Sequence, residues 1–413
     1  MFWKKSAPNE LRLFVSIGAG VNQLPLITEA KKLGFHVIGV DGNAHAPGMI
    51  KCDIRIQESL DHYKEIYVKL QELLLDGVIK GVLSKSYGIS IKTACYIANQ
   101  LNIPYIPHER VDDFINKQRM KSVFKAFDIP SPDYRVITAK TNIDRGPRIA
   151  YPGVVKPVVG HAKMGVRLIE GPAELKKVVT SAGKEGDYLL ENYVEGDEII
   201  AAGIVHGGRY YLADISDKVQ SPLPHFVDLI HISPSKYYSL RERVAEIGQK
   251  VAAAFEIGTS PLIMELRITD RGELFLIEAV PEFGGEFIPD VLIPERTGYN
   301  FIRETVKAVT GDEFVPPLQK PVKKHTVVKY ITAGNGTLMS FNPELPGLVE
   351  GMVFKKIFKE IGAQVSYPRT NLDRIGVVAV SARTREEALH GAETAIEGFN
   401  IRVASEEVRG KKG

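Results

Sequence analysis

The stretch 263–285, IMELRITDRGELFLIEAVPEFGG, constrains the fold of this chain most. It predicts two β-strands that fold back on each other about Asp270-Arg271-Gly272, followed by a glycine-rich turn. If Arg271 and Gly272 form a two-residue loop, Glu265 stands directly opposite Glu278 on one face of the hairpin. The other face is then filled by apolar side chains, namely Leu266, Ile268, Phe275 and Ile277.

Two directly opposed carboxylates repel each other, so this arrangement favours a cation between Glu265 and Glu278. One or two carboxylates together with substrate phosphates form the usual protein site for Mg²⁺. Two simpler readings stay open at this point. The pair could be exposed on a solvated sheet face, or a three-residue loop could shift the register.

Length and composition indicate a multidomain globular protein. The chain has 413 residues, of which 44% are hydrophobic and 25% charged, and this length predicts roughly two to four domains. A net charge of +3 gives no argument for a nucleic-acid or anionic-membrane partner. Only Cys52 and Cys95 are present, far apart and in no metal-ligand spacing, which favours a reducing compartment. No apolar run approaches the roughly 20 residues of a membrane span, and the run at residues 1–8 is too short for a signal peptide, so we expect a cytoplasmic protein.

Residues 11–115 alternate strand-like and helix-like segments, which predicts a parallel, doubly wound sheet. Ligands on such sheets gather at the carboxyl ends of the strands, here Gly18–Asn22, Asp41–Asn43 and Ser84–Gly88. The glycine turn at 18–20 followed by an aspartate also fits dinucleotide binding. The third glycine of that fingerprint is replaced by Gln23, so NAD remains a minor alternative.

From residue 116 the pattern becomes one that suits phosphate binding. Residues 116–127 predict an amphipathic helix with Lys117 near its start, and a short strand at 151–157 delivers Lys156. The loop that follows carries Gly160, Lys163 and Gly165. Backbone N–H groups and cations in such a loop can cover nucleotide phosphates, although a solvated hairpin loop is the simpler alternative.

The later segments predict a long loop and a separate small lobe. Loops as long as 217–234 are often functional, so His225 and His231 could touch substrate, but solvent-facing histidines are commoner. Beyond 316–317 the chain predicts a mixed α+β lobe, with strands at 325–331 and 375–381 and a helix at about 384–396.

In order and spacing, these features resemble the ATP-grasp superfamily. The features are Lys117, Lys156 with its glycine loop, Glu191-Asn192-Tyr193-Val194, Glu198 and the pair Glu265 and Glu278. The end of the chain, at 373–376 and 384–388, resembles the C-terminal lobe of the L-amino-acid ligase and carbamoyl-phosphate-synthase-like branch of carboxylate–amine ligases. The resemblance implies a pre-ATP-grasp domain at 1–115, an ATP-grasp domain at 116–315 with subdomains 116–190 and 191–315, and a C-terminal α+β lobe at 316–413.

The resemblance also implies a role for each matching residue. Lys117, Lys156 and Lys163 would contact ATP phosphates, and Gly160 and Gly165 would let the loop close over them. Residues 191–194 would form the hinge between the subdomains, where Glu191 begins the segment and backbone groups of Tyr193 and Val194 contact adenine. Glu198 would bind the ribose, and Glu265 and Glu278 would hold one or two Mg²⁺ ions, with Mn²⁺ as an alternative.

The chemistry implied by the resemblance is activation of a carboxylate by ATP. An acyl phosphate forms with release of ADP, and an amine or thiol then displaces phosphate. Metal and lysines must offset the charge of several anions, and a closed loop must exclude water from the intermediate. The expected partners are small-molecule carboxylates and amines. ATP-grasp enzymes are often dimers, so a homodimer is one candidate assembly.

Two positions depart from the pattern of the superfamily. Val280 replaces a metal-binding Asn, and Glu282 replaces an Arg that steadies the reacting carboxylate. In one explanation Glu282 binds a cationic or hydroxylated substrate group, or a metal, and Arg267 or Arg296 supplies the positive charge. Arg267 is the better candidate because it lies two residues from Glu265 on the same face. In the other explanation the site binds nucleotide without turnover.

Gly284 and Gly285 could point backbone N–H groups at an oxyanion, or simply form a turn. Three other activities compete with the ligase. A bicarbonate-phosphorylating carboxylase is disfavoured because the loop 159–165 lacks a run of glycines and Glu282 is unsuited to bicarbonate. A non-catalytic ATP-binding regulator stays open because of Val280 and Glu282. An NAD-dependent oxidoreductase finds no support beyond the first glycine turn.

Overall fold

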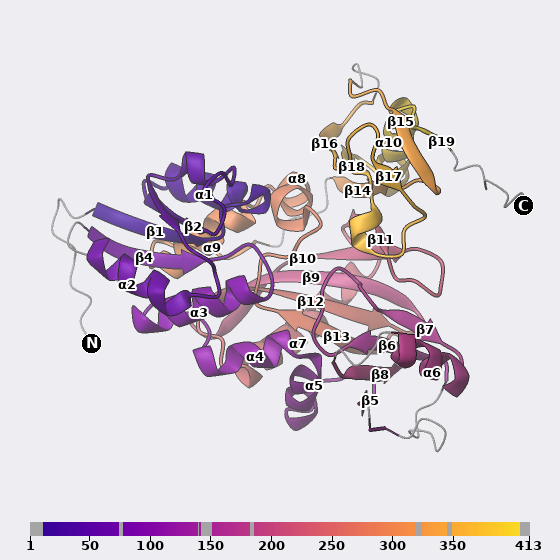
Figure 1. Ribbon diagram of the computed structural model, residues 1–413, viewed down its shortest axis with the longest axis horizontal. Coiled ribbons are helices and arrows are strands. Elements are labelled where there is room, and N and C mark those ends of the chain that lie inside the picture. The colour runs from indigo at the N-terminus through magenta and orange to yellow at the C-terminus, as the bar shows by residue number, and fades with distance from the viewer. Residues whose placement is uncertain are drawn as a thin grey trace, which may run out of the picture.

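The computed structural model describes residues 11–73, 77–138, 140–141, 151–181, 186–318, 324–344 and 349–404. The segment at 1–8, considered above as a signal peptide, lies outside these residues. Figure 1 shows the N-terminal part of the chain in indigo at one side and the C-terminal part in yellow at the top of the other side. No helix of the described residues is long and apolar enough to cross a membrane.

The N-terminal part forms the predicted parallel sheet, in the order β3-β2-β1-β4. Its strands are β1 (Leu11–Ile17), β2 (His36–Asp41), β3 (Ile54–Gln57) and β4 (Gly77–Leu83), with helices α1 (Leu24–Lys32), α2 (Tyr63–Leu73) and α3 (Ile89–Gln100). The Gln23 side chain packs against the first glycine turn, so closely that a Cβ added at Gly18 would lie 3.2 Å from it. This packing further disfavours dinucleotide binding at the turn.

A small antiparallel sheet, β5-β8-β6-β7, follows the N-terminal part. Its strands are β5 (Tyr134–Ile137), β6 (Gly153–Pro157), β7 (Arg167–Ile169) and β8 (Tyr188–Asn192), and the neighbouring helices are α4 (Val111–Ile115), α5 (Lys117–Ala126) and α6 (Pro172–Ser181). Helix α5 confirms the amphipathic helix predicted at 116–127. It begins at Lys117 because the Asn116 side chain caps it by accepting a hydrogen bond from the Arg119 N–H, as Asn commonly does at this position.

The largest sheet has the order β13-β12-β9-β10-β11-β14-β18-β16. Its strands are β9 (Asp197–His206), β10 (Arg209–Gln220), β11 (Asp228–Ser233), β12 (Ser260–Ile268), β13 (Leu274–Val280), β14 (His325–Ile331), β16 (Met352–Ile357) and β18 (Gly376–Ala382). Strands β11 and β14 pair directly, so the sheet continues into the predicted C-terminal lobe. The boundary at 315/316 stays a prediction, and the sheet runs across it.

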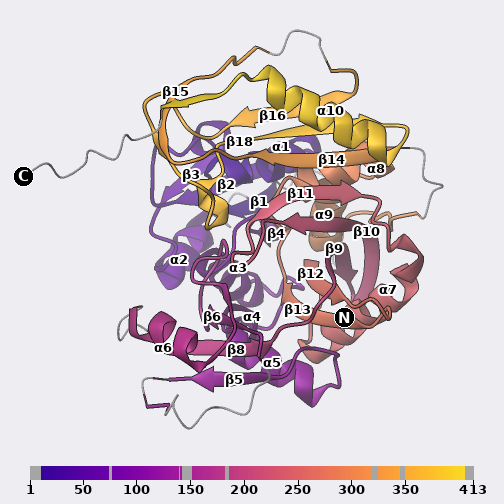
Figure 2. The ribbon, with the colours of Figure 1, turned by 90° about the vertical axis from the view of Figure 1, so that its right-hand side faces the viewer.

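Helices cover this sheet and connect it to the N-terminal part. They are α7 (Arg241–Ala254), α8 (Ile293–Thr297), α9 (Phe301–Thr310) and α10 (Arg385–Gly398). A further small sheet is formed by β15 (Gly336–Ser340), β17 (Gln364–Val365) and β19 (Arg402–Ala404). Figure 2 shows α10 lying along β14 and β18. Helix α9 contacts β9 and β12 of the large sheet and also packs on the N-terminal part, where Arg303 Nε lies 2.8 Å from Glu29 Oε2.

The β12–β13 hairpin keeps the predicted pairing of Glu265 with Glu278, but it reaches that pairing differently. The loop has three residues rather than two, because the Thr269 N–H donates to the Glu273 carbonyl over 3.0 Å. Gly272 adopts the left-handed φ of 74° that such a loop requires. A bulge on β13, where Ile277 is the extra residue opposite the Glu265–Leu266 step of β12, then shifts the register and brings the two glutamates back into line.

The bulge also corrects the predicted apolar face of the hairpin. The buried residues are Leu266, Ile268, Leu274 and Leu276. The prediction was wrong for Phe275, which is half-buried opposite Arg267, and for Ile277, which lines the cavity described below. An irregularity of one residue is invisible to a strict alternation of inward and outward side chains.

The prediction of a long loop at 217–234 was also wrong. Strand β10 continues to Gln220 and β11 begins at Asp228, so only a short connection remains. His231 lies in β11 and is fully buried, whereas His225 is half-buried in the connection and does not line the cavity.

Candidate active site

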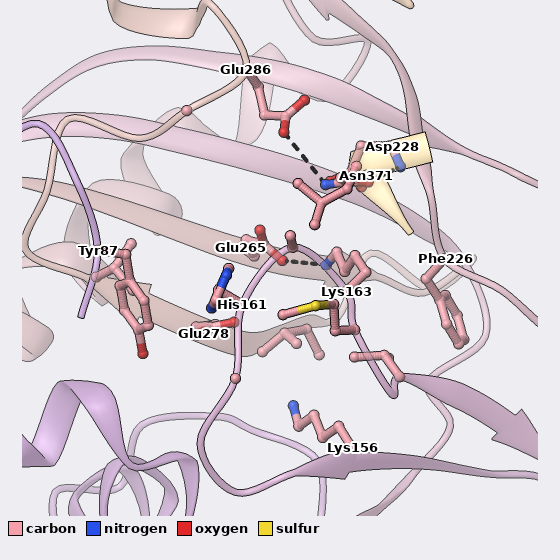
Figure 3. Close-up of a pocket in the computed structure, with 18 of the residues that line it drawn as sticks. Tyr87, Lys156, His161, Lys163, Phe226, Asp228, Glu265, Glu278, Glu286 and Asn371 are labelled. Carbon is pink, nitrogen blue, oxygen red and sulfur yellow. Dashed lines mark hydrogen bonds and ion pairs between the residues drawn. The ribbon is translucent and has the colours of Figure 1, made fainter. Parts of the chain in front are cut away.

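A cavity of about 920 Å³ lies between the N-terminal part, the small antiparallel sheet and the large sheet. Figure 3 shows Tyr87 and Phe226 on opposite sides of this cavity, with Glu265 and Glu278 between them. The predicted site residues that line it are Lys117, Lys156, Gly160, Lys163, Glu191, Tyr193, Val194, Glu198, Glu265, Arg267, Glu278, Glu282 and Gly285. The structure therefore brings most of them together from distant parts of the sequence.

Two predicted glycines do not line the cavity. Gly165 has a φ of 69°, and a Cβ there would lie 2.9 Å from Pro157 Cγ, so it serves the turn of the loop. Gly284 has a φ of 74° and packs against Ile263, where a Cβ would lie 3.1 Å from Cγ1. Both positions need glycine for backbone shape and close packing. A contact of either glycine with a ligand stays a prediction.

The paired glutamates lie among lysines. Glu265 Oε2 lies 3.0 Å from Lys163 Nζ, and its Oε1 lies 2.9 Å from Lys218 Nζ. Glu278 Oε1 lies 3.4 Å from Lys117 Nζ. Although burial opposes it, the two lysines hold the pKa of Glu265 well below its usual range. Glu265 is therefore in the ionised form that binds a divalent cation.

The donor set fits Mg²⁺ that is completed by substrate phosphates. Glu265 and Glu278 supply facing carboxylates, whereas Val280 supplies no ligand. The described residues contain no cluster of three or more acidic, histidine or cysteine side chains that could enclose a metal alone. Mg²⁺ commonly takes only one or two protein carboxylates and fills its remaining positions with phosphates and water.

Lys218 is a central residue of the site that the sequence analysis missed. Its side chain is fully buried, and its Nζ lies 2.8 Å from Glu198 Oε1, 3.2 Å from Asp228 Oδ1 and 2.9 Å from Glu265 Oε1. Burial alone would lower its pKa, but the three carboxylates raise it well above the usual value. The signal was present in the register, because Lys218 pairs with Glu198 across β9 and β10.

Lys156 lies beside a second buried lysine that was also missed. Glu191 Oε2 lies 2.9 Å from Lys156 Nζ, and its Oε1 lies 3.2 Å from Lys121 Nζ. Burial lowers the pKa of Lys121 to about 8, while Glu191 acts in the opposite direction. The Glu191 carboxylate is therefore turned toward these lysines and fixes Lys156 at the cavity wall. A direct contact between Glu191 and nucleotide stays a prediction.

Arg267 lies with the residues predicted for adenine and ribose. Its Nη2 donates to the Gly196 carbonyl over 2.5 Å, its Nη1 lies 3.5 Å from Glu198 Oε2, and its guanidinium lies 5.1 Å from the centre of the Tyr193 ring. No described contact joins it to Glu282. The alternative candidate, Arg296, pairs with Asp214 at 2.6 Å and does not line the cavity. The expected positive charge beside Glu282 is therefore not supplied by Arg296, and a catalytic role of Arg267 stays a prediction.

The glycine loop is held against the C-terminal part of the chain. The Asn371 N–H donates to the Ala162 carbonyl over 3.2 Å. The Asn371 amide also donates to Asp228 Oδ2 over 2.8 Å and to Glu286 Oε1 over 3.4 Å. Figure 3 shows Asn371 between Asp228 and Glu286. Asn371 thus connects the loop, β11 and the segment after β13.

The cavity lining contains further charged residues that the sequence analysis did not single out. Arg374 forms a two-point ion pair with Glu286, in which Nη2 lies 2.9 Å from Oε1. Its guanidinium lies 3.7 Å from the centre of the Tyr330 ring. Lys85 Nζ lies 2.9 Å from Asp290 Oδ2. Composition and spacing give no signal for these pairs, because their members come together only in the folded sheet.

Comparison with known families agrees with this geometry. Residues 149–290 match the model of the ATP-grasp domain. The central part of the chain is an ATP-grasp domain. Residues 329–404 match the model of L-amino acid ligase C-terminal domain 2. The resemblance predicted from the ordered lysines and glutamates is confirmed, as is the mixed fold with a parallel N-terminal sheet.

Relatives of this chain are distant. It is 26% identical over 322 residues to an uncharacterized protein of Sinorhizobium fredii, covering 75% of this chain and 65% of that protein. It is 24% identical over 243 residues to the D-alanine–D-alanine ligase of Aquifex aeolicus, covering 57% of this chain and 82% of that enzyme. The match therefore spans less than two thirds of the Sinorhizobium protein.

Among solved structures, the fold is similar to that of the L-amino acid ligase of Bacillus licheniformis. The TM-score is 0.80 at 18% identity, and the match covers 97% of this chain and 100% of that one. At this identity the likeness concerns the fold alone.

Proposed function

We propose that this protein is an ATP-dependent carboxylate–amine ligase that works through an acyl phosphate and releases ADP and phosphate. The observation that carries the proposal is the facing pair Glu265 and Glu278, which lies among three lysines within a large cavity. Phosphoryl transfer to a carboxylate gathers several anions, and positioning with charge compensation supplies most of its catalysis. The match to the ATP-grasp domain and the similarity to enzymes named as ligases support the same chemistry.

In this proposal each end of the cavity has its own task. Tyr193, Val194 and Glu198 bind the nucleoside, while Lys117 and Lys156 bind its phosphates and Gly160 and Lys163 close over them. Residues at the Tyr87 end hold the carboxylate and the amine. Mg²⁺, bound by Glu265 and Glu278, would neutralise phosphate charge when present.

The proposed reaction has two balanced steps. A carboxylate oxygen of the substrate attacks the γ-phosphorus, and the bond to the β-phosphate oxygen breaks with release of ADP. The neutral amine then attacks the acyl carbon, a C–N bond forms, the C–O bond breaks, and the proton lost from the nitrogen leaves with the phosphate as hydrogen phosphate. The cavity walls exclude water that would otherwise hydrolyse the intermediate. A thiol in place of the amine would follow the same course.

One assay tests the proposal. The purified protein is incubated with ATP, Mg²⁺ and panels of carboxylates and amines, and ADP, AMP and phosphate are measured. ADP and phosphate that depend on both a carboxylate and an amine support the ligase. AMP as the product would refute the acyl-phosphate route, and ADP that depends on bicarbonate alone would indicate a carboxylase. ATP binding with no turnover for any pair would favour a regulator.

The assembly is proposed separately. ATP-grasp enzymes are often dimers, and light scattering coupled to size-exclusion chromatography would distinguish a homodimer from a monomer.

A further inference from the structure

Glu282 differs from every other carboxylate that lines the cavity. Seven acidic side chains of the lining have a lysine or arginine nitrogen within ion-pair distance, namely Glu191, Glu198, Asp228, Glu265, Glu278, Glu286 and Asp290. Among the described residues, Glu282 alone of this set has no such partner. A half-buried carboxylate that is desolvated by its surroundings and has no cation partner is costly to a fold, so its presence at a cavity wall points to a ligand.

Two cations that line the cavity are already engaged. Lys85 acts electrostatically on Glu282, but its Nζ lies 2.9 Å from Asp290 Oδ2. The Arg374 guanidinium contacts Glu286 at two points, and its Nε donates to the Asn371 carbonyl over 2.8 Å. Neither side chain can turn to Glu282 without leaving another carboxylate unpaired.

Hydrogen-bond donors other than cations are also engaged at the Tyr87 end of the cavity. The Tyr87 hydroxyl, whose pKa is raised by burial and by the charges of Glu278 and Glu282, donates to the Phe114 carbonyl over 3.1 Å. Asp290 Oδ1 is buried and accepts no hydrogen bond from the described residues. The Glu282 carboxylate, which has no described ion-pair partner, and the unpartnered Asp290 Oδ1 are therefore the acceptors that this end of the cavity leaves open to a ligand.

The electrostatic state of Glu282 agrees with this geometry. Burial raises its pKa to about 7, Lys85 opposes the rise, and Glu278 and Glu265 add to it. A positive group brought against Glu282 would relieve this unfavourable environment. An anionic group would add to the repulsion.

We infer that Glu282, with Asp290 Oδ1 beside Lys85, binds a positively charged nitrogen group of the substrate at the Tyr87 end of the cavity. The inference rests on the proposed ligase function and names the class of one substrate as a small molecule that binds as an ammonium. It also explains the departure at this position. An arginine at 282 would attract an anion, whereas the glutamate selects a cation.

Ligand binding to the full-length protein tests this inference without requiring turnover. A library of small primary amines is screened in the presence of Mg²⁺ and a non-hydrolysable ATP analogue. Each amine that binds is compared by calorimetry with its hydroxyl and carboxylate analogues on the same carbon skeleton. Because truncating one partner of a buried charge pair costs about 2 kcal/mol or more, the ammonium member should bind wild-type protein at least about 30-fold more tightly than the hydroxyl member.

Variants assign the preference to Glu282. Glu282→Gln should reduce the ammonium preference to a few-fold or less, while Glu282→Asp, which keeps the charge, should retain part of it. Glu246→Gln removes an exposed carboxylate on α7, outside the cavity, and should leave the preference unchanged. Circular dichroism spectra would show that each variant is folded.

The outcomes separate this inference from the proposed function. An unchanged preference in Glu282→Gln, a preference for the carboxylate analogues, or a library without any amine that binds would overturn the inference. ADP release is measured in parallel with each ligand. Ammonium binding that depends on Glu282 but never leads to ADP release would support the inference and count against the ligase. Turnover with no Glu282-dependent preference would do the opposite.

Discussion

The Lys218 ammonium lies 2.9 Å from Oε1 of Glu265, at the point where Glu198 and Asp228 also meet. One buried cation therefore forms ion pairs with three carboxylates that line the cavity. It keeps Glu265 ionised and fixes its direction toward the cavity. The candidate metal site is thus supported from behind by a residue of a neighbouring strand.

Replacing Lys218 by Met should destabilise the protein strongly, because Glu198, Asp228 and Glu265 would lose their shared partner. Breaking a buried ion pair costs on the order of 3–5 kcal/mol, which corresponds to a fall in Tm of about 3–6 °C for a chain of 413 residues. Scanning calorimetry measures the fall. Lys250→Met, an exposed position on α7, is the matched control and should change Tm little.

The pH dependence of the Lys218→Met defect has a predicted sign. The folded-state pKa of Glu265 is depressed, so its ionisation stabilises the wild type above the usual carboxylate pKa, and this contribution is lost as the pH falls. The gap in Tm between wild type and Lys218→Met should therefore narrow below about pH 5. A gap that stays constant between pH 8 and pH 4.5 would contradict this account.

The paired glutamates should differ in their effect on stability but not on turnover. Glu278→Gln should abolish turnover with little change in Tm, because Glu278 has a single lysine partner at 3.4 Å. Glu265→Gln should abolish turnover and also lower Tm, because Glu265 pairs with both Lys163 and Lys218. ADP release and calorimetry measure the two effects. Normal turnover in either variant would remove the metal assignment.

Asn371 should control how firmly the glycine loop is held. Asn371→Ala loses the amide bonds to Asp228 and Glu286, each worth about 1–3 kcal/mol where a charged acceptor is left behind. Asn371→Asp should be worse, because it places a third carboxylate beside these two. We expect a higher KM for ATP and faster proteolysis within 158–166, both in the order wild type, Ala, Asp. Equal behaviour of the two variants would show that charge at this position is unimportant.

Much of the nucleotide end of the cavity was predictable, because its residues follow a fixed order along the chain. Lys117, Lys156, Glu198, Glu265 and Glu278 each sit at a local pattern of helix, strand or loop, and all of them line the cavity. The predicted pairing of Glu265 with Glu278 was right, although the two-residue loop from which it was derived is not present. A three-residue loop and a bulge compensate for each other, and alternation of side chains cannot reveal either one.

The charged network around Asn371 and the buried Lys218 were much less predictable. Arg374, Glu286 and Asn371 are separated by long stretches of sequence and meet only because β14, β16 and β18 extend the central sheet. Lys218 was missed because a lysine in a strand ordinarily faces solvent. Its burial is explained only by the neighbouring strands, which place three carboxylates around it.

The last prediction concerns the cost of Glu282 to the folded protein. Its pKa in the folded state is about 7, against a usual value of 4.5. Between these values the folded protein retains a proton that the unfolded chain has released, so stability falls as the pH rises through this range and the full cost is present above it. The Glu282→Gln variant has no titrating carboxyl group at this position, so its stability lacks this pH dependence. Its Tm should equal that of the wild type near pH 4.5 and exceed it at pH 8 by a few degrees, for a cost on the order of 1–3 kcal/mol.

The control Glu246→Gln should show no such divergence in Tm from the wild type. An ammonium ligand should reverse the divergence between Glu282→Gln and the wild type, because it stabilises only the protein that keeps Glu282. If the two Tm curves stay parallel from pH 4.5 to pH 8, the Glu282 carboxylate is not held in an unfavourable environment and the argument for a cationic substrate loses its electrostatic support.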